Sequence, residues 1–200
     1  MDSRCCQNAE DITHKVCLIT ILLTLSFQIA VIHSEEVDRN AEYRQTVRQY
    51  AGELKGNLFA ALEGNDVIGA ISVCSQKAPQ IADNISREKN WEIRRTSLRV
   101  RNAENAPDAW ESKTLEAFEQ RRARGEDLAT MEYSELQDNL GQKVFRYMKV
   151  IPAGQLCLTC HGTQIAPDVQ AKLMELYPED QSTGFSPGEI LGAFSIKQSL

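Results

Sequence analysis

The chain has few aromatic residues, few glycines and prolines, and no surplus of positive charge. Aromatic side chains make up 6% of its 200 residues, and 11 glycines with 6 prolines give no sign of a repeat or a low-complexity segment. The formal net charge is −6 without a basic stripe, which argues against nucleic-acid binding. Six cysteines are too few for a disulfide scaffold. With 42% hydrophobic and 25% charged residues, the composition is that of a globular domain, and it excludes a disordered, collagen-like or multi-span membrane protein.

A long apolar run lies near the amino end, at residues 16–32, and reads VCLITILLTLSFQIAVI. Ser34 follows it as a small residue suited to a signal-peptidase cut, although acidic residues outnumber basic ones before the run. An uncleaved anchor, which needs roughly 20 apolar residues, is the alternative. We therefore expect residues 1–34 to be a signal peptide or an N-terminal anchor. Residues 35–200 then form an exported, periplasmic domain, tethered to the inner membrane only if the N-terminal segment is not cleaved.

Two stretches with apolar residues at helical spacing predict amphipathic helices over residues 43–62 and 67–85. Pro79 is expected to kink or end the second helix. Cys74 falls on the apolar face of that helix, beside Ile71.

The later segments carry both helix and strand signals. Asp108 and Glu111 form a capping-box pattern ahead of a helix that Gly125 ends, with Ala117 and Phe118 expected to point inward. The remaining patterns predict a helix over 169–177 and strands over 92–101, 132–134, 143–151 and 190–196. Helices at the front and isolated strands behind predict an α+β fold, with an antiparallel sheet flanked by helices and a long N-terminal helix.

The strongest chemical signal is the motif CLTCH, which contains Cys157, Cys160 and His161. In an exported chain the spacing C-x-x-C-H predicts covalent attachment of haem c, one per chain. The two thiols reach the two vinyl groups of one porphyrin, and the adjacent histidine offers its imidazole to the iron. A thioredoxin-like redox pair, a zinc site and a short structural disulfide are the alternatives. A zinc site would need further ligands, and His161 is the one histidine in residues 35–200.

The residues alone do not decide the second axial ligand of such an iron. The candidates are Met131, Met148, Met174 and Cys74, or an open position. A methionine on an apolar face is usually a core residue, whereas an odd cysteine in an exported domain calls for a partner.

Three segments carry a family resemblance: AISVCSQKAPQIA around Cys74, RRTSLRVRNAENAPDAWE at 94–111, and CLTCHG at 157–162, with GAFSIK at 192–197 adding to them. They resemble a family of exported mono-haem c-type cytochrome domains with a PAS-like fold, long catalogued as a domain of unknown function. The resemblance implies a PAS-like antiparallel sheet flanked by helices. It also implies that His161 and Cys74 are the two axial ligands.

Four arginines, at positions 94, 95, 99 and 101, lie inside the second of these segments. Arginine commonly binds carboxylates, so we expect at least one of them to contact a haem propionate, with Arg95 and Arg101 as the candidates. The alternative is a solvated strand face or an ion pair with Glu104 or Glu111.

The expected function is a redox or small-ligand sensor that passes its signal to a separate, unknown redox or signalling partner. A periplasmic electron-transfer cytochrome is the first alternative. A peroxidase-like enzyme is less favoured because no second histidine is available for peroxide chemistry. A haem-free thiol oxidoreductase is the last alternative, and we expect no catalysis by this chain.

Overall fold

The computed structural model describes residues 39–64 and 66–200, and the predicted signal peptide or anchor at 1–34 lies outside the described residues. Within the described part of the chain, no helix is both long enough and apolar enough to span a membrane. Residues Tyr43–Leu200 form one compact unit.

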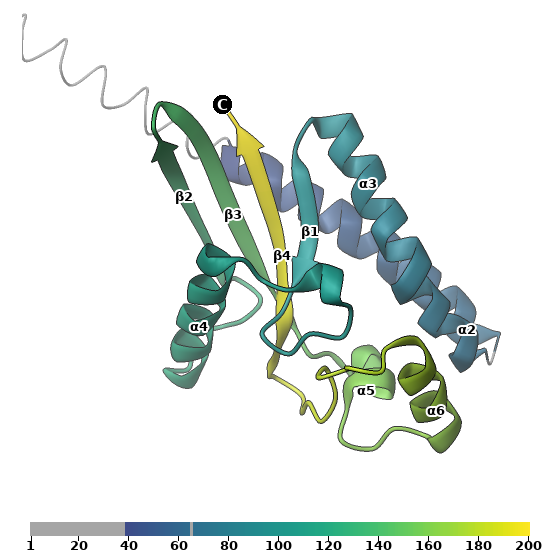
Figure 1. The fold of residues 1–200 in the computed structure, drawn as a ribbon. Coiled ribbons are helices and arrows are strands. Elements are labelled where there is room, and N and C mark those ends of the chain that lie inside the picture. The colour runs from purple at the N-terminus through teal and green to yellow at the C-terminus, as the bar shows by residue number, and fades with distance from the viewer. Residues whose placement is uncertain (1–38, 65) are drawn as a thin grey trace, which may run out of the picture. The chain divides into compact units, whose positions relative to one another are not determined.

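A four-stranded antiparallel sheet lies at the centre of this unit, with strand order β1-β4-β3-β2 (Figure 1). The strands are β1 (Glu92–Thr96), β2 (Glu132–Asn139), β3 (Gln142–Pro152) and β4 (Ile190–Ser199). Helices cover both faces, so the predicted α+β fold with a helix-flanked antiparallel sheet is confirmed. The PAS-like description stays a prediction.

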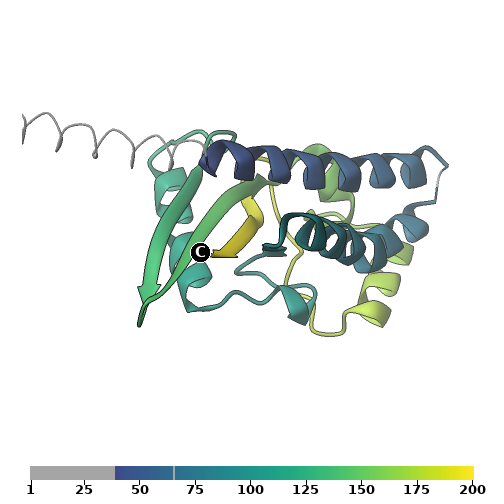
Figure 2. The same ribbon diagram turned by 90° about the horizontal axis from the view of Figure 1, so that it is seen from above.

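One face of the sheet packs against the long N-terminal helix, described over residues 39–63, and against α3 (Ala78–Lys89). Side chains of the helices and of alternate strand positions share one core, which includes Tyr43, Tyr50, Tyr147 and Phe194. Figure 2 shows the two helices running along the same side of the sheet. The predicted helix over 43–62 is thus confirmed.

The opposite face packs against α4 (Ala109–Ala123), which lies beside the lower part of the strands in Figure 1. Asp108 and Glu111 form the predicted capping box at its start, and Gly125 follows its end with a φ of +84°. Phe118 is fully buried as predicted, but Ala117 is exposed, because Leu115 takes the inward position instead.

Three shorter helices complete the described fold: α2 (Val67–Ser72), α5 (Gln155–His161) and α6 (Pro167–Leu176). A π-helical segment, η1 (Val73–Lys77), joins α2 to α3, and a 3₁₀ turn, η2 (Ala103–Asn105), follows β1. The predicted strand over 92–101 is wrong in its second half, since β1 ends at Thr96 and the chain then turns away from β4. The alternating apolar residues beyond it lie in that loop.

Candidate functional site

A cavity of about 540 Å³ opens between the N-terminal helix, η1, the loop after β1, α5 and the end of β3. All of its lining residues lie within the compact unit Tyr43–Leu200. The cavity brings together every sequence-predicted site residue: Cys74, Arg95, Arg101, Cys157, Cys160 and His161.

The C-x-x-C-H motif lies on the short helix α5. Cys157, Cys160 and His161 are therefore at helical positions i, i+3 and i+4, which share one face. Gly162 ends the helix, and its N–H donates to the Leu158 carbonyl. A Cβ at Gly162 would lie 2.5 Å from that carbonyl oxygen, so this tight turn requires glycine. The helix thus presents two thiols and an imidazole to the cavity together.

The imidazole of His161 is held in one tautomer. Its Nδ1 lies 2.7 Å from the Ser182 carbonyl oxygen, which can only accept a hydrogen bond, so Nδ1 carries the proton. The lone pair of Nε2 then faces Arg101, whose Nη1 donates to it across 3.3 Å. Burial, and next the positive charge of Arg101, lower the pKa of His161 to about 3. The ring is therefore neutral near pH 7, the form in which Nε2 can bind a metal.

Cys74 reaches the cavity because of the π-helical segment. In η1 the Ala78 N–H donates to the Val73 carbonyl, five residues back, and Pro79 follows at the start of α3. Pro79 lies in the first turn of α3, directly after the irregular turn that interrupts the helix predicted over residues 67–85. The turn contains one more residue than a regular α-helical turn. Ile71 before it and Ala78 after it pack into different hydrophobic clusters, so these two side chains do not share one face with Cys74. Cys74 itself is half-buried and lines the cavity.

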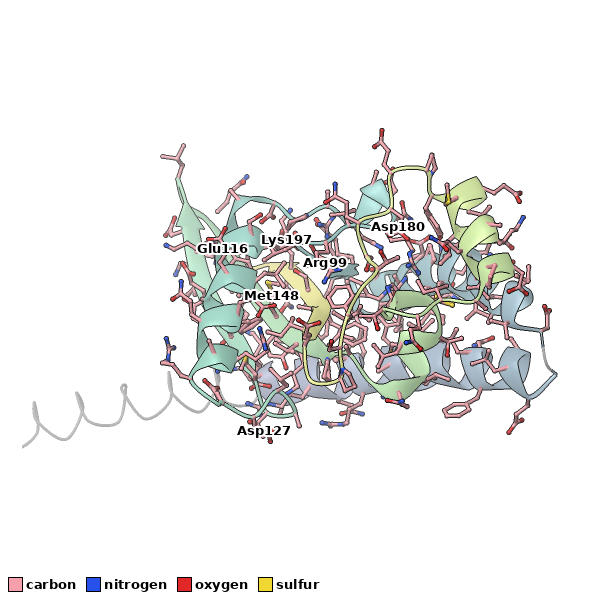
Figure 3. All side chains as sticks on the ribbon, turned by 90° about the horizontal axis from the view of Figure 1, so that it is seen from below. Arg99, Glu116, Asp127, Met148, Asp180 and Lys197 are labelled. Atoms are coloured by element: carbon pink, nitrogen blue, oxygen red, sulfur yellow. The ribbon has the colours of Figure 1, made fainter. Side chains whose placement is uncertain are left out.

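The methionine candidates lie elsewhere. Met131 and Met148 are fully buried in the cluster between α4 and the sheet, and Met174 is 65% exposed. None of the three lines the cavity. Figure 3 shows Met148 beside α4, well apart from the loop that carries Asp180. Of the second-ligand candidates named from the sequence, Cys74 is the one that the structure brings to His161's cavity.

The thiols do not have the features of a redox-active dithiol. Cys74, Cys157 and Cys160 are free and half-buried. Burial raises the pKa of Cys160, whereas a nucleophilic cysteine needs a lowered pKa. Within residues 39–64 and 66–200, no group of three or more histidine, cysteine or acidic side chains is placed to hold a metal ion, so the zinc alternative gains no support.

The cavity wall is apolar and positively charged. Its charged lining residues are all cationic, with no aspartate or glutamate among them: Arg48, Lys55, Arg95, Arg99, Arg101 and Lys149. Much of the remaining wall is aliphatic, from the N-terminal helix and the ends of β3 and β4. Such a lining suits a ligand with an apolar body and carboxylates.

The arginines divide into separate roles. Arg94 points away from the cavity and pairs with Glu111 at 2.8 Å, the ion-pair alternative of the sequence analysis. Arg101 pairs with Asp180 at 2.9 Å. Arg95 lines the cavity, and its Nη2 donates to the Cys74 carbonyl oxygen across 3.4 Å. Among the predicted candidates, Arg95 is thus better placed than Arg101 to meet a carboxylate in the cavity.

Sequence reasoning missed several residues of this site. Arg48 and Lys55 come from the N-terminal helix, Lys149 from β3, and Asp180 and Ser182 from the loop after α6. No local motif marks any of them, because each reaches the site through tertiary packing.

Comparison with known proteins adds the family. No curated protein matches the chain. A solved structure, the crystal structure of the cyanobacterial heme-protein Tll0287, is similar with a TM-score of 0.52 and 24% sequence identity, over 64% of this chain and 71% of that one. At this identity the likeness shows the fold alone. The model of the Tll0287-like family matches residues 26–199, which is most of the chain. The protein therefore belongs to the Tll0287-like family.

Proposed function

We propose that this protein carries one covalently attached haem c in the cavity and acts as an exported redox or small-ligand sensor. The observation that carries the proposal is the meeting of two thiols, a neutral imidazole and a third thiol around one cavity. The similar crystal structure, which is of a heme-protein, supports it.

The donor set and the wall fit this cofactor. A haem has an apolar macrocycle and two carboxylates, and the cavity offers aliphatic side chains and six cationic residues without a carboxylate. Its volume of about 540 Å³ is within the usual range of small-molecule sites, roughly 300–1,000 Å³. The neutral imidazole and the cysteine sulfur are both established types of iron ligand.

Each residue then has a defined task. The thiols of Cys157 and Cys160 would hold the haem through its two vinyl groups, each S–H adding across one double bond, and Nε2 of His161 would bind its iron. The Cys74 sulfur would be the second ligand, and Arg95 would bind a propionate. When bound, the haem supplies a one-electron centre whose potential depends on its ligands and on the dryness of the pocket.

Ligation by both His161 and Cys74 would fill both axial positions, which is why we propose sensing without catalysis. A small ligand would then have to replace one of these two ligands, and we propose that it replaces the Cys74 sulfur. We propose that the change in ligation is passed to a separate partner in the periplasm.

Electron transfer is the second candidate. Two exposed cationic residues at the edge of the cavity, Arg48 and Lys55, favour it. The residues that line the cavity include no aspartate or glutamate that would offset their charge. A cationic rim of this kind attracts anionic partners and speeds their encounter with the site.

The test of ligation is the absorption spectrum of the purified ferric protein, compared with Cys74→Ala. We expect a six-coordinate, low-spin parent and a variant that becomes high-spin or takes another ligand. Met148→Leu is the control, since Met148 is buried outside the cavity and should leave the spectrum unchanged. An unchanged spectrum in Cys74→Ala would show that Cys74 is not the ligand.

The test of sensing uses carbon monoxide on the reduced protein. Formation of a carbonyl complex, with loss of the cysteine ligand, supports a sensor. A spectrum that does not respond to carbon monoxide in the reduced state supports the electron carrier instead.

A further inference from the structure

The carboxylate of Asp180 helps to hold the loop after α6 against the rest of the site, together with backbone hydrogen bonds such as that from the Gln181 N–H to the Val100 carbonyl. Asp180 accepts a hydrogen bond from the Ser182 N–H at 2.7 Å through Oδ1. Its Oδ2 accepts from Nε of Arg101 at 2.9 Å. Both side chains are only 10% exposed, so this ion pair is largely removed from water. Figure 3 shows Asp180 on this loop, with Arg99 of the neighbouring segment on the side toward the sheet.

Arg101 extends the connection to the motif helix. Its Nη2 donates to the Cys160 carbonyl at 2.6 Å and to the Ser182 carbonyl at 3.0 Å. Its Nη1 is the nitrogen that lies 3.3 Å from Nε2 of His161. One guanidinium therefore joins the end of α5 to the carbonyl that receives the histidine Nδ1–H.

We propose that the Asp180–Arg101 pair is a positioning device for His161: it holds the Ser182 carbonyl against Nδ1–H and so keeps Nε2 aimed into the cavity. This inference rests on the proposed function and deepens it. It assigns Arg101 to support of the histidine, and leaves Arg95 as the candidate for a propionate. Partners of this kind fix the tautomer and orientation of metal-binding histidines and tune the metal.

The contacts of Arg101 are divided among the nitrogens of its guanidinium. Only Nη1 approaches Nε2, the nitrogen that would bind the metal. The contacts to Asp180, Cys160 and Ser182 use Nε and Nη2. Because the guanidinium is planar and rigid, a metal at Nε2 would require Arg101 to shift as a whole, and the carboxylate of Asp180 beside Nε is the anchor about which it would move.

The pair also makes an electrostatic prediction that a purely structural role does not. Together the two side chains carry no net charge. Asp180→Asn leaves the guanidinium unbalanced beside the histidine, which favours the reduced iron and raises its potential. Arg101→Gln leaves the carboxylate unbalanced, which favours the oxidised iron and lowers the potential. General loosening of the site would shift both variants in the same direction.

The experiment is a redox titration of the haem-loaded parent, of both single variants and of the double variant. We expect each single change to alter the ratio of oxidised to reduced protein about tenfold at a fixed applied potential, in opposite directions, which is 59 mV for a one-electron couple. The double variant should lie close to the parent, because it restores charge balance.

Two controls remove the same charges elsewhere. Arg94→Gln removes a positive charge from the same segment but outside the cavity wall. Asp127→Asn removes a negative charge from an exposed position that Figure 3 shows far from Asp180. Both should stay near the parent potential.

The outcomes separate this inference from the proposed function. A parent without covalent haem overturns both. A haem-loaded parent whose single variants do not shift, or shift in the same direction, overturns only the positioning role. If Arg101→Gln does not accumulate as folded protein, Asp180→Asn decides alone: a raised potential supports the inference, and an unchanged or lowered potential overturns it.

Discussion

The protonation of His161 in the chain without attached cofactor is open to direct measurement. Cys157→Ser with Cys160→Ser removes the attachment thiols and leaves the histidine in place. The pKa of the His161 imidazole in the folded chain is about 3, against an ordinary value of 6.5. The difference of about 3.5 units corresponds to about 5 kcal/mol, at 1.36 kcal/mol per unit.

The sign follows from which state takes up the proton first. Below pH 6.5 the unfolded chain binds a proton at His161, whereas the folded chain does not until about pH 3. The stability linked to this residue is therefore complete above about pH 6.5 and is lost as the pH falls toward 3. At pH 4.5, two units below the unfolded value, the loss is about 3 kcal/mol.

Two assays measure this effect. His161 is the one histidine in residues 35–200, so its ring proton signals in an NMR titration of that segment need no assignment. Urea unfolding at pH 7 and pH 4.5, repeated with His161→Gln added, isolates the contribution of this residue. A ring that titrates near pH 6.5 in the folded chain, or equal pH dependence with and without the histidine, would refute the reasoning.

Three further predictions concern the fold and the cavity rim. Glu111→Ala should lower the free energy of unfolding by about 3 kcal/mol in urea titrations. The substitution leaves the buried Arg146 with fewer charged partners and removes the capping box of α4. A variant as stable as the parent would contradict this. Phe118→Ala should cost ~3–5 kcal/mol in the same assay, since Phe118 is fully buried, and a cost under about 1 kcal/mol would count against the core described. In stopped-flow experiments the haem-loaded protein should exchange electrons with hexacyanoferrate, an anion, faster than the net negative charge of the chain implies. The rate should fall as salt is added. Arg48→Gln with Lys55→Gln should slow that reaction, and a rate indifferent to both changes would argue against a cationic rim.

The elements with strong local signals were predictable. Regular apolar spacing marks the N-terminal helix, and the Asp108 and Glu111 pair marks the start of α4 to the residue. β3 and β4 were recognised from apolar runs bounded by turn residues, although β4 continues to Ser199. In the two helices the sequence determines the local structure through contacts within a few residues, whereas the two strands are marked by their composition and flanking turns but form by pairing with each other.

Other features depend on contacts that the sequence does not display. The loop after Thr96 has the alternation of a strand but lacks a partner strand beyond that point. The π turn that contains Cys74 joins α2 to α3, and these two helices pack into different hydrophobic clusters. Arg101 meets Asp180 across 79 positions, so only the folded chain reveals their pairing. The motif residues could be named from spacing alone, whereas the residues that orient them could not.

Covalent attachment of haem at Cys157 and Cys160 is tested most directly by a haem stain of denatured protein, produced in a host able to mature c-type cytochromes. We expect the parent polypeptide to keep its stain after unfolding and separation, and Cys157→Ser with Cys160→Ser to lose it. Colourless parent protein from such a host would contradict the central claim.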